Sequence, residues 1–167
     1  MFLWLASVHS VAYAVTRNVV SSGGSGTSDC TTTACTMSRA NAVVQPGDVV
    51  SIANGTYTTN IAPAVSGTAA NPITYRGAST SASVPAATLS SKAYITLDNI
   101  KFDSVKNGWV TTNASSSNIT ITNCTFNSTD NGVSPTNYSY VGVSIQGNYN
   151  VLRNNTFQRW YGGDLVR

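Results

Sequence analysis

The sequence predicts an all-β protein with the architecture of a right-handed parallel β-helix, a solenoid whose N-terminal turns carry a short capping helix. Three observations predict this class. Short segments of alternating apolar and polar residues recur along the chain, and three of them continue into the same Asn-to-Phe step. The 167 residues are also rich in Ser, Thr, Asn and Gly but only 9% charged, whereas soluble domains typically carry about 25% charged residues. This polar composition favours strands and turns over surface helices.

The recurring segments are expected to be neighbouring strands of one wall. They read VVSI, PITY, YITL, NITI and YNVL, and they end at Ile52, Tyr75, Leu97, Ile121 and Leu152. Because side chains alternate across a strand, these terminal residues point inward and the residues beside them point outward. The alignment places Ile52 beside Tyr75. It also places Arg76 beside Asp98, where the two form a surface ion pair worth about 0–1 kcal/mol.

The Asn-to-Phe step is expected to form the inner wall of the solenoid. It occurs in LDNIKF, ITNCTF and LRNNTF. This structural ladder consists of Asn99, Asn123, Asn154, Phe102, Phe126 and Phe157. Asn tolerates left-handed backbone geometry and can both donate to and accept from buried backbone groups, while the stacked phenylalanines fill the core.

A short helix is expected to cover the open end of the solenoid. The stretch SRANAVVQPGD, residues 38–48, has an apolar face made of Ala40, Val43 and Val44, and Pro46-Gly47 ends it. Terminal repeats need such a cap because they have no neighbour on one side.

The first 14 residues are interpreted as the remnant of a secretory signal peptide. They are apolar and end in Ala12-Tyr13-Ala14, a small-residue cleavage pattern, although a positively charged start is missing. The alternative is a first buried strand. Residues 15–167 would then be one β-helix domain that is incomplete at its C-terminus. We therefore expect a protein that is secreted or located at the cell surface.

The three cysteines fit export. Cys30 and Cys35 lie close together in a loop rich in Gly, Ser and Thr, and an oxidising compartment would let them form a disulfide. A metal-binding pair is the alternative, although the only histidine, His9, lies in the signal segment. Cys124 lies inside a repeat and is expected to be a small buried hydrophobe.

The charge pattern excludes some partners. The net charge is +3 and no basic run is present, so nucleic acid is not an expected partner. No stretch beyond the N-terminal segment is long and apolar enough to span a membrane. We expect a monomer, and no cofactor is evident.

Three stretches resemble the pectate-lyase-like right-handed β-helix proteins: PGDVVSIANGTY (46–57), SGTAANPITYRG (66–77) and YNVLRNNTF (149–157). This family includes secreted polysaccharide lyases of the chondroitinase B/alginate lyase and pectate lyase groups, and the resemblance covers residues 18–167. It implies β-elimination, in which a Lys or Arg takes the proton next to a uronate carboxylate and Ca²⁺ or another cation neutralises that carboxylate. No cluster matches a catalytic motif of the family, so Ca²⁺ is expected only in a full-length protein.

The candidate functional residues are cations and aromatics near the end of the chain. Arg153 and Arg159 are candidate catalytic residues because uronate chemistry needs cations close to carboxylates; the alternative is solubilising charge. The candidate polysaccharide-binding residues are Tyr138, Tyr140, Trp160 and Tyr161. Their alternative role is packing at the rim. The Asp residues are scattered, so no metal site is predicted.

The sequence thus predicts a secreted β-helix protein that acts on polysaccharide, as a lyase that cleaves a uronate-containing glycan by β-elimination. A non-catalytic adhesion or glycan-binding β-helix protein is the alternative. This 167-residue piece alone is expected to be inactive.

Overall fold

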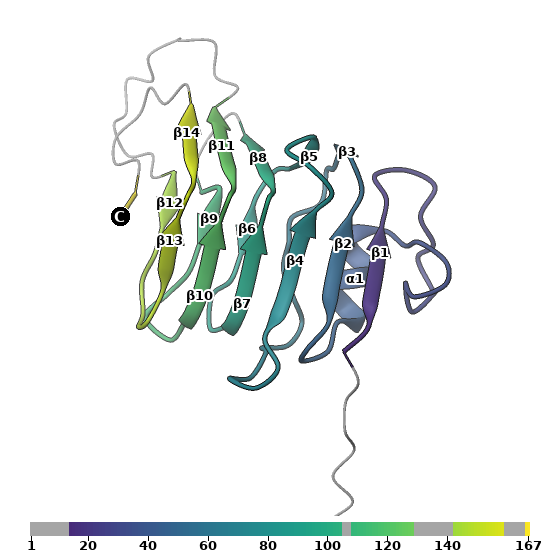
Figure 1. Cartoon of the computed structure of the whole chain (residues 1–167), viewed down its shortest axis with the longest axis horizontal. Helices are drawn as coiled ribbons and strands as arrows, with labels where there is room; N and C mark the ends of the chain where they lie inside the picture. The colour runs from purple at the N-terminus through teal and green to yellow at the C-terminus, as the bar shows by residue number, and fades with distance from the viewer. Residues whose placement is uncertain (1–13, 105–107, 129–141, 159–165) are drawn as a thin grey trace, which may run out of the picture.

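The described part of the chain forms three parallel β-sheets and one short α-helix (Figure 1). The structure is a computed structural model that describes residues 14–104, 108–128, 142–158 and 166–167. The largest sheet has six strands in the order β1-β2-β4-β7-β10-β13, and they lie side by side across Figure 1. These strands are Thr16–Val19 (β1), Val49–Ile52 (β2), Ile73–Gly77 (β4), Ala93–Asp98 (β7), Ser117–Thr122 (β10) and Val151–Arg153 (β13).

The other two sheets are smaller. The second sheet has five strands in the order β14-β11-β8-β5-β3. They are Thr156–Gln158 (β14), Thr125–Ser128 (β11), Lys101–Ser104 (β8), Ala82–Val84 (β5) and Gly55–Thr56 (β3). The third sheet has three strands in the order β12-β9-β6. They are Val143–Ser144 (β12), Val110–Thr111 (β9) and Ala87–Thr88 (β6).

This arrangement corrects the expected fold class. The parallel pairing of the recurring segments is present, but a right-handed parallel β-helix also requires walls that close into a solenoid. Of the described residues, 42% are in strands and 5% in helix, and the strands form three sheets of unequal extent that are neither closed nor a solenoid. The third sheet has only two-residue strands, which are too short to complete a wall. A period-2 pattern identifies neighbouring strands, but it carries no information about how sheets join.

The register of the six-stranded sheet matches the alignment from β4 onward. Leu97 lies opposite Tyr75, and Ile121 lies opposite Leu97. Between β2 and β4 the expected register is wrong by two residues, because Ile52 lies opposite Gly77. A shift of two leaves every side chain on its face. A glycine suits position 77, since a Cβ there would lie 2.2 Å from the Asn99 carbonyl oxygen.

The core lies between the sheets. The inward residues Tyr75, Leu97 and Ile121 are fully buried. In the five-stranded sheet the rings of Phe102 and Phe126 stack with centroids 5.1 Å apart, and Phe157 continues the stack at 4.8 Å. The phenylalanines of the Asn-to-Phe step therefore pack as one column.

The asparagines of the step have the expected left-handed geometry but not the expected position on an inner wall. Asn99, Asn123 and Asn154 each have a φ of 55°, a left-handed conformation that costs most other residues about 1–2 kcal/mol. However, Asn99 is half-buried, and the other two are exposed, so they do not line the inner wall. Asn99 nevertheless serves buried backbone, because its Nδ2 donates to the Gly77 carbonyl at 3.1 Å. Asn155 does so through both ends of its amide. Its Oδ1 accepts from the Cys124 amide and its Nδ2 donates to the Ile121 carbonyl, both at 2.9 Å.

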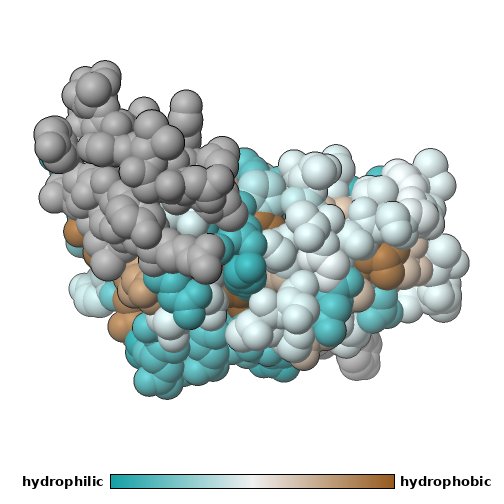
Figure 2. Space-filling view, turned by 90° about the horizontal axis from the view of Figure 1, so that it is seen from above, coloured by the Kyte–Doolittle hydropathy of each residue, from teal (hydrophilic) through white to brown (hydrophobic). Residues whose placement is uncertain are grey.

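The expected helix is present as α1, Met37–Val43, and in Figure 1 it lies behind β1 and β2. It begins there because the side chain of Thr36 accepts a hydrogen bond from the Arg39 amide, which satisfies a free donor of the first turn. Met37 and Ala40 are buried on its inner face. Figure 2 shows that the surface seen from above, outside the grey residues, is mostly neutral or hydrophilic with small hydrophobic patches.

The cysteines occupy the expected roles. Cys30 and Cys35 form a disulfide, and both are fully buried. Burial raises the pKa of the Cys124 thiol to about 12, so this thiol stays protonated. Residues 1–13 of the expected signal segment lie outside the described part of the chain. In the part that is described, no helix is long and apolar enough to cross a membrane.

Candidate functional site

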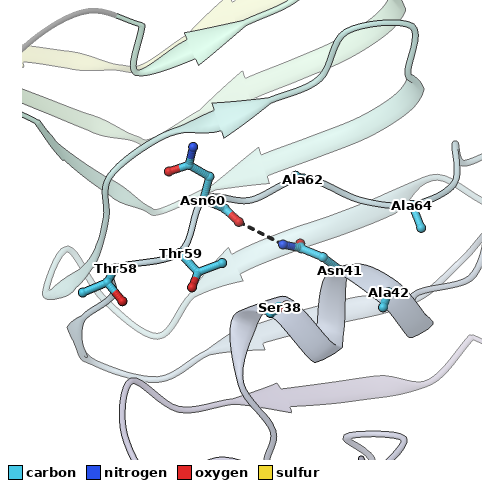
Figure 3. Close-up of a pocket in the computed structure, with 8 residues that line it drawn as sticks. All are labelled: Ser38, Asn41, Ala42, Thr58, Thr59, Asn60, Ala62 and Ala64. Carbon is cyan, nitrogen blue, oxygen red and sulfur yellow. Dashed lines mark hydrogen bonds between the residues drawn. The ribbon is translucent and has the colours of Figure 1, made fainter. Parts of the chain in front are cut away.

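One hollow lies at the N-terminal end of the molecule, between α1 and residues 58–64 (Figure 3). Its volume is about 570 Å³. Its lining consists of small, mostly polar residues: Ser38, Asn41, Ala42, Thr58, Thr59, Asn60, Ala62 and Ala64. None of these lining side chains is charged, so this groove offers hydrogen-bonding groups but no acid, base or anion-binding group.

Asn41 holds the groove together. Its Nδ2 donates to the Asn60 carbonyl at 2.9 Å (Figure 3), and its Oδ1 accepts from the Tyr75 hydroxyl at 3.0 Å. Burial, with a smaller contribution from the charge of Asp48, raises the pKa of Tyr75 well above its usual value, so the hydroxyl remains a donor. The Asn41 amide is thus used for structure.

The outer face of the six-stranded sheet carries more chemistry. In one column of paired positions, Thr74, Thr96 and Thr120 are neighbours and Val151 follows them. Two residues further along each strand, a second column runs Arg76, Asp98, Thr122 and Arg153. Side chains two residues apart share a face, so both columns face outward.

The middle of the second column is neutralised. Arg76 Nε lies 2.9 Å from Asp98 Oδ2, which forms the ion pair expected from the alignment. The Asn123 Nδ2 donates to Asp98 Oδ1, also at 2.9 Å. Both carboxylate oxygens of Asp98 therefore have a partner, and the Nε of Arg76 is held in the ion pair.

The β13 end of the column is different. Arg153 is exposed, and its guanidinium has no side-chain partner within the described residues. On the same face of this strand, Val151 is 43% exposed, and Tyr149 at the strand entrance is 83% exposed. An unpaired cation and an apolar residue thus lie at alternate positions of β13, and an aromatic residue lies just before the strand. We call Tyr149, Val151 and Arg153 the β13 face.

A second ionic group lies on the five-stranded sheet. Asp103 Oδ2 contacts Lys101 Nζ at 2.5 Å, and Asp103 Oδ1 accepts from Asn127 Nδ2 at the same distance. Partial burial acts to raise the pKa of Asp103, but the hydrogen bonds from Lys101 and Asn127 outweigh it and bring this pKa below 3.8.

We expect Asp103 to contribute to the acid sensitivity of the fold. Its pKa is lower in the folded than in the unfolded chain, so its contribution is complete above about pH 4. It is lost as the pH falls through the lower, folded value. Urea unfolding measured from neutral pH down to about pH 2 should therefore show a shallower loss of stability in Asp103→Asn than in the wild type. An unchanged pH dependence would contradict this.

The structure describes only part of the predicted site. Arg153 is placed as described above. Arg159 and the aromatics Tyr138, Tyr140, Trp160 and Tyr161 lie outside the described residues. The phenylalanines of the ladder are structural. In the described ranges no group of three or more His, Cys, Asp or Glu side chains could hold a metal ion.

Sequence reasoning missed Tyr149 and Tyr94. The alignment that defines the strands also places Tyr94, Asn118 and Tyr149 in one column, directly before the inward residues. That column is the signal that could have identified them, but the aromatic clusters nearer the chain end drew the prediction instead.

Comparisons with known proteins assign no family to this chain. No protein-family model, curated protein or solved structure matches it. The pectate-lyase-like resemblance therefore stays a prediction.

Proposed function

We propose that this protein binds an acidic, uronate-containing polysaccharide outside the cell, and that the β13 face is part of the binding surface. The observation that carries the proposal is the exposed guanidinium of Arg153, which has no side-chain partner in the described part of the chain. Guanidinium groups bind carboxylates through paired, charge-assisted hydrogen bonds. The neighbouring Tyr149 ring supplies an exposed apolar surface against which a sugar can pack.

Two further features support this proposal. The described surface carries few charges, and Arg153 and Arg167 are its exposed arginines without a side-chain partner. The Cys30–Cys35 disulfide is typical of proteins that fold in oxidising compartments, where extracellular polysaccharides are met.

Binding is favoured over cleavage because of the state of the lysines. β-Elimination needs a free base beside the bound uronate. Of the two described lysines, Lys101 pairs with Asp103, and Lys92 Nζ donates to the Ala64 carbonyl at 2.8 Å. Neither lies on the β13 face, so Arg153 is the one Lys or Arg of that face, and it cannot both neutralise the carboxylate and act as the base.

The test compares two arginines of the same column. Wild type, Arg153→Gln and Arg76→Gln are titrated with pectate, alginate and chondroitin oligosaccharides by calorimetry at low and high salt. A lost charge-assisted hydrogen bond is worth about 1.5–3 kcal/mol, so Arg153→Gln should weaken binding at least about tenfold. Arg76→Gln removes the same charge from an arginine that is already paired, and we expect it to bind nearly as the wild type does.

Three outcomes would contradict the proposal. One is no binding of any of the three glycans by the wild type. Another is equal weakening in both variants, which would mean that only net charge matters. The third is ultraviolet absorbance of an unsaturated product in the same mixtures, which would contradict binding without cleavage.

A further inference from the structure

Three residues at the entrance of neighbouring strands adopt the left-handed conformation. They are Tyr94, Asn118 and Tyr149, with φ of 54°, 54° and 58°. The register makes them neighbours, since Ser117 lies opposite both Ala93 and Asn148. They form a column at the opposite end of the strands from Asn99, Asn123 and Asn154, which share this conformation.

Tyrosine is an unfavourable choice for this conformation. Asn visits the left-handed region readily because its short polar side chain can bond locally, whereas a bulky residue there is an outlier. At the exit end all three positions are Asn, and at the entrance Asn118 shows that Asn also fits there. For Tyr149 the strain is not offset by burial, because its side chain is 83% exposed.

Residues whose backbone strain is not offset by burial of the side chain are concentrated at functional sites. We propose that Tyr94 and Tyr149 form an aromatic platform that contacts two sugars of a glycan lying across the strands. Two strand spacings separate these residues, about 9.6 Å. The rise per sugar in an extended polysaccharide is close to one strand spacing, so the rings meet alternate sugars and the Asn118 amide lies between them.

This platform deepens the proposed function and rests on it. The half-buried Tyr94 and the exposed Tyr149 pack against the apolar faces of the rings. Arg153 lies four residues beyond Tyr149, about 13 Å along the strand direction, so it binds a carboxylate separately from the sugars on the platform. The platform itself takes a glycan of at least three sugars, oriented across β7, β10 and β13.

The test uses a substitution that separates strain from binding. The variants Tyr149→Asn and Tyr94→Asn replace each tyrosine by Asn, the residue that already occupies position 118 between them. We expect the urea midpoint of each variant to stay unchanged or rise, because strain is relieved. We expect affinity for the best of the pectate, alginate and chondroitin oligosaccharides to fall about two- to tenfold per ring, the size of one aromatic contact. Tyr149→Phe keeps the ring and should keep most of the affinity.

Chain length gives a second readout. Wild-type affinity should rise from disaccharide to tetrasaccharide, and the Tyr94→Asn/Tyr149→Asn double variant should lose that rise. A wild type that binds none of the three glycans overturns both the proposed function and the platform. A wild type that binds and is weakened by Arg153→Gln, but not by either tyrosine substitution, overturns the platform alone. A lowered urea midpoint with unchanged affinity likewise overturns it, since the tyrosines would then be structural.

Discussion

Replacing Asp48 by Ala is expected to lower the free energy of unfolding by about 3–5 kcal/mol, the usual cost of leaving one partner of a buried ion pair alone. The Asp48 side chain is 1% exposed, and its Oδ2 lies 2.5 Å from Arg17 Nε. The same carboxylate accepts hydrogen bonds from the Gln45 and Val15 amides. The substitution therefore leaves the buried Arg17 guanidinium and two backbone donors without their acceptor. Urea unfolding monitored by circular dichroism measures the loss.

The matched control is the exposed pair. The Arg76 side chain is 57% exposed, and Arg76→Ala should cost only about 0–1 kcal/mol. A loss of that same small size for Asp48→Ala would contradict the prediction. The double variant Arg17→Met/Asp48→Leu removes both charges. It should recover part of the stability, because a well-packed apolar pair can replace a buried ion pair.

The effect is large because Arg17 joins three segments. It lies in β1, its Nε contacts the turn that follows α1, and its Nη1 donates to the Asp29 carbonyl at 2.6 Å in the disulfide loop. Its backbone pairs with Val50 of β2. Loss of the ion pair therefore loosens the N-terminal edge of the six-stranded sheet as well as one contact.

Strand faces and neighbours were predictable because they depend on local alternation. The Arg76–Asp98 pair follows from the alignment alone. How the three sheets are joined was not predictable, because it depends on the segments between the strands. Residues 62–72 are an example. Their path is set by bonds such as Gly67 amide to Ala93 carbonyl at 2.9 Å, which leave no periodic trace in the sequence. The asparagines of the step were misplaced for a related reason: a left-handed corner and a buried amide ladder both favour Asn.

The buried ion pair could have been suspected. In the segment TRNV, alternation puts Arg17 on the same face as Val19, which is buried, and an inward arginine requires a buried acid. The candidate site was harder to predict. Whether an arginine is unpaired depends on where the acidic side chains lie around it, and the sequence does not give these positions. The sequence could nominate Arg153 but could not separate it from Arg76.

The other large effect is expected at the centre of the aromatic column. Phe126 is fully buried and stacks between Phe102 at 5.1 Å and Phe157 at 4.8 Å, with Trp109 tilted against it at 5.6 Å. Phe126→Ala should cost about 3–5 kcal/mol, since it removes buried area and leaves a cavity among rings that cannot collapse into it. Phe126→Leu fills part of the space and should cost less.

The position in the column decides the size of the effect. Phe157 ends the column and is half-buried, so Phe157→Ala leaves a cavity open to one side and should cost clearly less than Phe126→Ala in the same urea titration. Equal losses would contradict this prediction, because neither burial nor position in the column would then set the cost. Because β11 lies between β8 and β14, local unfolding around Phe126 would also affect both neighbouring strands. In that case the slope of the urea transition should fall as well as its midpoint.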